Sequence, residues 1–283
     1  PRNFFSRVQG SDTLLPMSTE ADSGREVRAR AQAEKYLSTC DEYTDPYEHE
    51  KLVRDWVKKG DVAERVVEDV RQRAGEVRGK RILDIGFGSG LYSVAFARAG
   101  AETYGLEVND VLHQIAHENA RDAGVNVDFR VYDGNKFPFA DNFFDCAFSV
   151  SVIEHVTDAR MVIKEACRVL KPGGKFYLAF PNRWRPREAH TGIFFLSYVS
   201  RSFAQVLLRK FWKRNTVEEL NLHFLSYWSM KKLLFGTQFR ITFEYGGKTW
   251  PRRALKRLLG ALGIHHSAIL GTVMVVLEKN NTV

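Results

Sequence analysis

The chain has 283 residues, of which 44% are hydrophobic and 27% charged, and it carries a formal net charge of +8. This balance excludes a disordered chain and predicts a folded core, while no apolar run reaches the ~20 residues of a membrane-spanning helix. The positive charge favours an acidic partner, such as nucleic acid, an anionic membrane or an anionic substrate, without selecting one of them.

The N-terminal quarter differs in composition from the rest of the chain. Residues 1–25 are polar and small and predict a mobile arm, and residues 26–75 are rich in charge and alanine and predict a helical cap. The first residues contain no apolar segment followed by a cleavage site, so we expect a cytoplasmic protein. The three cysteines, which show no metal-ligand spacing, also favour a reducing compartment without structural zinc.

From Arg81 onward, short apolar runs alternate with helical stretches, which is typical of β-α units around a parallel sheet. The predicted strands are residues 81–85, 102–107, 127–132, 144–150, 175–180, 239–245 and 271–278. The predicted helices are residues 91–99, 110–123, 158–169, 227–235 and 252–261. The last two strands are expected to form an antiparallel pair at the edge of the sheet. The segment 183–226 is too long to be a plain loop, so we expect it to form an inserted subdomain.

A glycine-rich turn follows the first predicted strand, in the sequence RILDIGFGSG. Gly86, Gly88 and Gly90 alternate with other residues, so bare backbone and the free N–H groups of a helix start can approach a ligand. The spacing is G-x-G-x-G, because Leu91 stands where the usual dinucleotide fingerprint has its third glycine. A ligand other than a dinucleotide is therefore favoured.

Acidic side chains stand at the ends of the first three predicted strands. Glu107 can accept hydrogen bonds from both hydroxyls of a ribose, although a helix cap or a solvated charge is the alternative. Asp133 can bind the exocyclic amine of an adenine, although Asp-Gly is also a favoured turn. Asp84 is expected to be buried near the glycine turn, where it holds backbone N–H groups or faces a cationic group of a ligand.

Four segments taken together, RILDIGFGSG, YGLEVND, VYDGNKFPFADNFFDCAFSVSVIEHV and RVLKPGGKFYLAFPN, resemble class I S-adenosylmethionine-dependent methyltransferases. The similarity is greatest to the small-molecule group that includes ubiquinone- and menaquinone-biosynthesis methyltransferases. It covers residues 78–182 closely and residues 226–278 loosely. The resemblance implies a Rossmann-like α/β fold: a seven-stranded, mostly parallel sheet with an antiparallel last strand, helices on both faces and a helical insertion after the fifth strand. The methyltransferase domain would then span residues 26–283.

The resemblance also implies S-adenosyl-L-methionine as the cofactor and assigns residues to it. Gly86 and Gly88 would line its methionine part, Glu107 would hold its ribose, and Asp133 with Gly134 would face its adenine. The remaining candidates for the cofactor site are Asp84, Phe87, Val108 and Val150. Because this cofactor has no phosphate, a phosphate-binding lysine is not required.

Two histidines are candidate catalytic bases, because imidazole has a pKa near ~6.5 and can accept the proton of a hydroxyl. His155 follows Glu154 just after the fourth predicted strand, where a helix-start hydrogen-bond pair is the alternative role. His190 lies after the fifth strand in NRWRPREAHTGIFF, whose polar and aromatic residues suit an acceptor pocket, with plain loop packing as the alternative. Some ubiquinone-pathway relatives bind a divalent metal through an acidic residue three positions before the Glu-His pair. Ser151 stands there in this chain, so we expect no metal.

The acceptor is left open by the sequence. We expect O-methylation of a hydrophobic or lipid-like small molecule, with C-methylation of a quinone-like acceptor, or an RNA or protein substrate, as alternatives. Nucleic acid is disfavoured because the chain has SVSVIEHV after the fourth strand instead of an NPPY-like tetrapeptide. A non-enzymatic protein is disfavoured by the glycine turn with Glu107 and Asp133.

The inserted segment contains a helical pattern of apolar and basic residues over 192–215. Its apolar residues follow steps of three and four and are Phe195, Leu196, Val199, Phe203, Val206, Leu207 and Phe211. The pattern predicts either a lid packed on the domain or a surface that contacts an anionic membrane. Residues 252–262 repeat the basic pattern.

Overall fold

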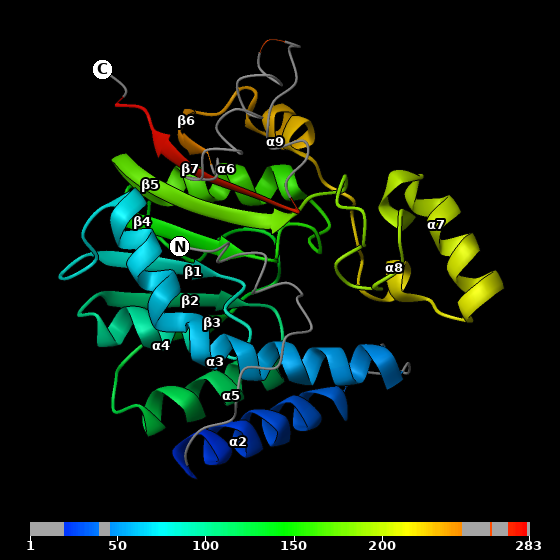
Figure 1. The fold of residues 1–283 in the computed structure, drawn as a ribbon. Coiled ribbons are helices and arrows are strands. Elements are labelled where there is room, and N and C mark those ends of the chain that lie inside the picture. Colours follow the sequence, from blue (N-terminus) through cyan, green and yellow to red (C-terminus); the bar gives the residue numbers. More distant parts are fainter. Residues whose placement is uncertain (1–19, 40–45, 245–260, 262–270, 282–283) are drawn as a thin grey trace. The chain divides into compact units, whose positions relative to one another are not determined.

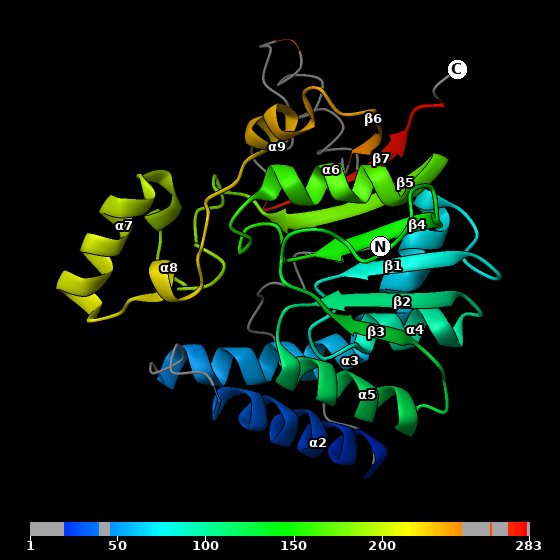
Figure 2. The same ribbon diagram turned by 180° about the vertical axis from the view of Figure 1, so that it is seen from behind.

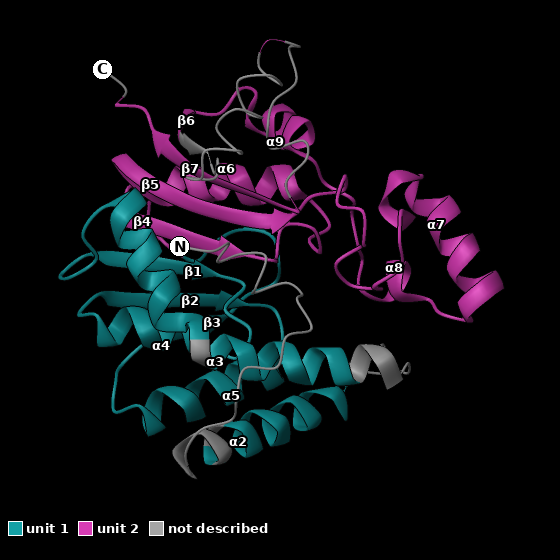
Figure 3. Cartoon of the chain, in the orientation of Figure 1, with its two compact units in different colours: residues 1–138 teal, residues 139–283 magenta. Residues whose placement is uncertain are grey.

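The computed structural model in Figure 1 describes residues 20–39, 46–244, 261 and 271–281. The chain forms two compact units, residues 1–138 and 139–283, which Figure 3 shows in different colours. The predicted helix 252–261, except for its last residue, lies outside the described residues. So does the predicted arm up to residue 19, whereas its last residues belong to a helix that begins at Glu20.

The first unit combines three parallel strands with helices. Its elements are α2 (Glu20–Leu37), α3 (Pro46–Ala74), β1 (Arg81–Ile85), α4 (Leu91–Arg98), β2 (Glu102–Glu107), α5 (Asp110–Asp122) and β3 (Asp128–Val131). Strand β2 lies between β1 and β3 and is parallel to both. Helix α5 begins where the Asn109 side chain accepts hydrogen bonds from the backbone N–H groups of Val111 and Leu112.

Two apolar clusters hold this unit together. In one of them α2, α3 and α5 meet around Trp56 and Ile115, which are 5% and 0% exposed. In the other, Phe87 after β1 packs against Phe129 of β3, with ring centroids 4.6 Å apart. The N-terminal helices are therefore part of the packed structure around the strand ends, because their apolar residues are buried with those of α5.

The second unit contains the other strands of the sheet. Its elements are β4 (Phe144–Val150), α6 (Ala159–Val169), β5 (Leu170–Pro181), the 3-10 helix η1 (Leu196–Tyr198), α7 (Arg201–Leu207), the π-helix η2 (Leu208–Trp212), α8 (Thr216–Glu219), α9 (Tyr227–Leu234), β6 (Phe239–Glu244) and β7 (Thr272–Lys279). Strand β5 is parallel to β4, and β7 is antiparallel to both β5 and β6. Figure 2 shows α6 and α9 side by side on one face of these strands, in agreement with their contact.

The seven described strands have the order β3-β2-β1-β4-β5-β7-β6, so the predicted Rossmann-like sheet with an antiparallel last strand is confirmed. Strands β1, β2 and β4 have the predicted bounds. Strand β5 is longer than the predicted 175–180, because it begins at Leu170 and includes Pro172, Gly173 and Gly174. The pairing with β4 shifts in register there, from Phe144–Leu170 to Cys146–Lys175, which absorbs the extra residues as an irregularity in the strand.

The insertion between β5 and α9 has a small core of its own. Leu196, Ala204, Leu208, Val217 and Leu222 are buried together. The predicted continuous helix over 192–215 is instead three short helical segments, η1, α7 and η2, separated at residues 199–200 before α7. In Figures 1 and 2, α7 and α8 stand away from the strands of the same unit.

The cysteines and the helices of the described residues show two further properties. Cys146 and Cys167 are free and buried, and burial raises the pKa of the Cys146 thiol to about 12, which makes it unreactive. Among the residues that the structure describes, no helix is both long enough and apolar enough to span a lipid bilayer.

Candidate functional site

The loop from Gly86 to Gly90 connects β1 to α4 and has the backbone that its glycines permit. Gly86, Gly88 and Gly90 have φ values of 72°, 56° and 74°. A Cβ atom at Gly90 would lie 2.7 Å from the Cβ of Ala116, so this glycine allows the loop to pack on α5. A Cβ at Gly88 would meet only the Nζ atom of Lys59, at 4.0 Å. The space beside Gly88 is therefore open to a ligand.

Glu107, the last residue of β2, is fixed beside this loop. Its Oε2 accepts a hydrogen bond of 3.0 Å from the N–H of Gly88, and its Oε1 accepts one of 2.8 Å from the N–H of Val108. Burial raises the pKa of Glu107, and these backbone hydrogen bonds oppose the increase. A carboxylate has about four acceptor positions, so the side chain can still accept a hydrogen bond from a ligand beside these backbone N–H groups and that of Asn109.

Asp84 lies within β1 and is 2% exposed. The hydroxyl of Ser93 in α4 donates a hydrogen bond of 2.6 Å to its Oδ2. Burial raises the pKa of Asp84 to about 7, while Ser93 and the positive charge of Lys59 oppose the increase. Neither Ser93 nor Lys59 belongs to a motif, so the sequence pattern does not single them out.

The residues predicted to face an adenine lie at the ends of β2 and β3. Asp133 is exposed and accepts hydrogen bonds from the backbone and side chain of Asn135, at 2.9 and 3.1 Å, and these bonds lower its pKa. A Cβ at Gly134 would lie 3.8 Å from Cγ1 of Val108, whose side chain is 57% exposed. Val108 and Gly134 thus present an apolar surface, and Asp133 next to Gly134 adds one polar group.

One predicted cofactor residue has its side chain in the interior instead. The ring of Phe87 is 3% exposed and packs on Phe129. A Cβ at Gly105 would lie 2.6 Å from Cδ1 of Phe87, so the ring fills the space above β2. Only the backbone of Phe87 is available to a ligand at the glycine loop.

The second unit contains the other predicted site residues. Val150 is half-buried at the end of β4, and Ser151 follows it with a φ of 57°. A left-handed conformation is unusual for a residue other than glycine and is frequent at functional loops. The chain turns here and leads to Glu154 and His155.

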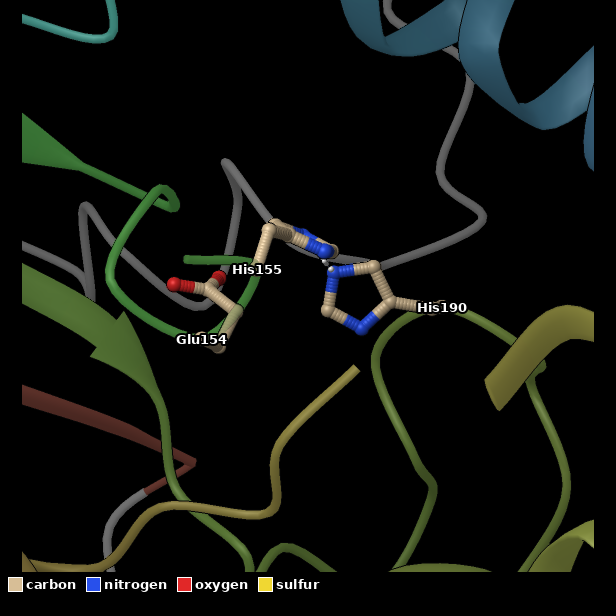
Figure 4. A group of neighbouring side chains, drawn as sticks. All are labelled: Glu154, His155 and His190. Atoms are coloured by element: carbon tan, nitrogen blue, oxygen red, sulfur yellow. Dashed lines mark hydrogen bonds between the residues drawn. The ribbon is translucent and has the colours of Figure 1, made fainter. Parts of the chain in front are cut away.

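The two predicted histidines meet. Nε2 of His155 lies 3.1 Å from Nε2 of His190, and Glu154, which is 1% exposed, has a carboxylate oxygen within 4.8 Å of both (Figure 4). Nδ1 of His155 lies 2.8 Å from the carbonyl oxygen of Leu220, and Nδ1 of His190 lies 3.0 Å from Oε1 of Glu188. Both rings are thus oriented through their Nδ1 atoms.

Glu188, which is 5% exposed, is the anchor of the His190 loop. Its carboxylate accepts hydrogen bonds from the backbone N–H groups of His190 and Thr191 and from the Thr191 hydroxyl. Burial alone would raise the pKa of Glu188, but the adjacent His190 and these hydrogen bonds outweigh it and hold the pKa at about 2. Glu188 is therefore ionised at neutral pH.

Comparison with known proteins gives the family. Residues 83–178 match the Methyltransferase domain family. A ubiquinone biosynthesis O-methyltransferase of Sinorhizobium fredii is 36% identical over 107 residues, which are 38% of this chain and 43% of that protein. This chain thus matches less than half the length of that relative.

Solved structures share the fold at low identity. An S-adenosylmethionine-dependent methyltransferase from Mesorhizobium loti has a TM-score of 0.53 and 17% identity, covering 75% of this chain and 96% of that one. The [4+2]-cyclase SpnF has a TM-score of 0.55 and 19% identity, covering 95% and 99%. The fold therefore does not specify one reaction. By the family match, residues 83–178 are a methyltransferase domain, and its fold is shared with S-adenosylmethionine-dependent methyltransferases.

Proposed function

We propose that this protein transfers the methyl group of S-adenosylmethionine to a hydroxyl of a small hydrophobic molecule. The observation that carries the proposal is the carboxylate of Glu107, which is fixed by the N–H groups of Gly88 and Val108 beside the open space at Gly88. Its remaining acceptor position suits a hydroxyl of a ribose.

We infer the residues that bind the adenine and the methionine part of the cofactor from the chemistry of the groups near Glu107. Asp133 would accept a hydrogen bond from the adenine amine, with the ring against Val108 and Gly134. Asp84 and the backbone at Gly86 and Phe87 would face the methionine part. Val150 would contact the cofactor at the end of β4.

The cofactor supplies the reactive methyl group, and the protein aligns the acceptor with it. A bound S-adenosylmethionine would supply the methyl group to the acceptor oxygen and would leave as the neutral thioether, and the hydroxyl proton would pass to water. O-methylation is supported by the similarity to ubiquinone biosynthesis O-methyltransferases. We place the acceptor oxygen on the side of His155 and His190, whose loop and insertion bring polar groups together.

A hydrophobic acceptor is supported by the surface of the insertion. Aromatic side chains that are 45–64% exposed lie along it, namely Phe194, Phe195, Phe203, Phe211 and Trp212. Exposed Lys210 and Lys213 lie among them, with Nζ of Lys210 5.5 Å from the centre of the Phe211 ring. We propose that this aromatic and basic surface contacts an anionic membrane from which the acceptor is taken.

The function is tested with methyl-labelled S-adenosylmethionine. The protein is incubated with hydroxylated aromatic and prenylated compounds, with RNA and with a protein extract, and label is followed in each fraction. Label in an extractable hydroxylated compound, sensitive to Glu107→Ala, is the expected result. If label appeared only in RNA or only in protein, the acceptor would belong to that class instead of the small molecules. If calorimetry showed no binding of S-adenosylmethionine, the proposed function would be overturned.

A further inference from the structure

Three side chains from two separate segments converge in the second unit. Glu154 and His155 lie in the loop after β4, and His190 lies 35 residues further along in the insertion after β5. Figure 4 shows the two imidazole rings with nitrogen atoms facing each other and Glu154 beside them. We call these residues the Glu154–His155–His190 cluster.

The hydrogen bonds around the rings fix where their protons lie. The carbonyl oxygen of Leu220 can only accept, so Nδ1 of His155 carries a hydrogen and donates it. The Glu188 carboxylate accepts hydrogen bonds from the backbone N–H groups of His190 and Thr191 and lies 3.0 Å from Nδ1 of His190, so this ring also donates through its Nδ1. In two neutral imidazoles of this form, both Nε2 atoms present lone pairs, yet they lie 3.1 Å apart.

Two lone pairs that face each other at this distance repel unless a cation lies between them. The cation is either a shared proton or a metal ion. Ligands bound to zinc at about 2.0–2.1 Å, with angles from octahedral to tetrahedral, lie about 2.9–3.4 Å apart. The separation of 3.1 Å between the Nε2 atoms is within this range. One ligand oxygen of Glu154 lies within 4.8 Å of the histidine nitrogens, so all three side chains surround the same small volume.

The groups behind the ligands fit a metal site as well. A histidine that binds metal usually donates its other ring N–H to a carbonyl or carboxylate, which orients the ring and makes the ligand nitrogen more basic. Here His155 has the carbonyl of Leu220 and His190 has Glu188 as such partners. Glu154 and Glu188 are 1% and 5% exposed, and a carboxylate buried to this degree is stabilised in its charged form by a nearby cation.

We propose that Nε2 of His155, Nε2 of His190 and the carboxylate of Glu154 bind one divalent transition-metal ion. Zinc is the first candidate, because two imidazoles and one carboxylate suit it and leave a position for a further oxygen ligand. The expectation that no metal binds depended on Ser151 alone. His190 replaces the missing acidic ligand from a different part of the chain. Metal binding by this cluster does not depend on the proposed methyl transfer.

The test is metal titration of the full chain after treatment with a chelator and its removal. Calorimetry with zinc should show one equivalent bound, and cobalt should give visible absorption bands of a site with nitrogen ligands. His190→Ala should weaken binding at least tenfold, and Glu188→Gln, which loses only the outer partner, should weaken it about 10- to 100-fold. Circular dichroism checks that the variants are folded, and Glu154→Gln provides a second ligand variant.

The chain offers a matched control on α5. His113 and His117 also have Nε2 atoms close together, 3.2 Å apart, but they lie in the first unit and outside the cluster. His117→Ala should leave the strong binding unchanged. Absence of binding by the unaltered protein, or equal binding by His190→Ala, would overturn the proposal and leave a proton shared by the two rings.

Discussion

The backbone N–H of Gly88 donates a hydrogen bond of 3.0 Å to Oε2 of Glu107, a residue 19 positions later in the chain. This bond joins the loop after β1 to the end of β2, the neighbouring parallel strand. The two features that the sequence associates with a nucleoside ligand are thereby joined by a hydrogen bond of the protein itself. Such preorganisation lowers the cost of ordering the site on binding.

Glu107→Ala should weaken the binding of S-adenosylmethionine by about 1–3 kcal/mol, because a buried charged hydrogen-bond partner of the ribose is lost. Isothermal titration calorimetry measures the change. The control is Glu102→Ala at the other end of β2, whose exposed ion pair with Arg81 contributes little. Equal affinity of both variants and the unaltered protein would show that Glu107 only caps the loop.

Gly90→Ala should destabilise the fold by about 1–3 kcal/mol more than Gly124→Ala. Both residues have a positive φ, 74° and 66°, so both substitutions cause backbone strain. Only at Gly90 would the new Cβ lie 2.7 Å from Ala116, whereas nothing lies within 4 Å at Gly124. Urea unfolding of the two variants separates packing from strain, and similar midpoints would contradict the close contact with α5.

The raised pKa of Asp84 should make stability depend on pH. Its folded pKa is about 7 against an ordinary value of 3.8, so between these values the folded state holds a proton that the unfolded state releases. Stability therefore falls as pH rises from about 4 to about 7, by roughly 1.4 kcal/mol per pKa unit. Asp84→Asn keeps an acceptor for Ser93 without this titration.

Urea unfolding of the cofactor-free protein at pH 5 and pH 8 measures the effect. The loss of stability between these two values should be smaller in Asp84→Asn than in the unaltered protein. Identical pH dependence in the two proteins would mean that Asp84 keeps an ordinary pKa.

The aromatic and basic surface of the insertion should bind anionic vesicles and not neutral ones at low salt. Each basic residue near the surface contributes on the order of 1 kcal/mol, so high salt should release the protein. A double substitution, Phe203→Ser with Phe211→Ser, should reduce co-sedimentation. Phe235→Ser is the control, because Phe235 is 78% exposed but follows α9, outside the insertion. Retention of binding by the double variant would exclude this surface as the contact.

The sheet and the proximity of Gly88 to Glu107 can be predicted from the sequence alone. The bounds of β1, β2 and β4 follow from apolar runs that end in glycine, Glu or loop residues. Gly88 and Glu107 were predicted to share a site, because successive parallel strands of a β-α fold end at the same edge. These features depend on short stretches of chain and on a general rule of topology, so no knowledge of side-chain packing was needed.

The covering of the insertion and the meeting of the two histidines depend on the folded structure. The apolar pattern over 192–215 predicted a helical stripe, but a pattern cannot say what covers it. Leu196 is 3% exposed in the core of the insertion, whereas Phe203 and Phe211 are 52% and 63% exposed. The sequence offers His155 and His190 as two separate candidate bases, and Ser151 in place of an acidic residue predicts no metal. The loop held by Glu188 brings the two Nε2 atoms to 3.1 Å, and this proximity depends on long-range folding of segments 35 residues apart.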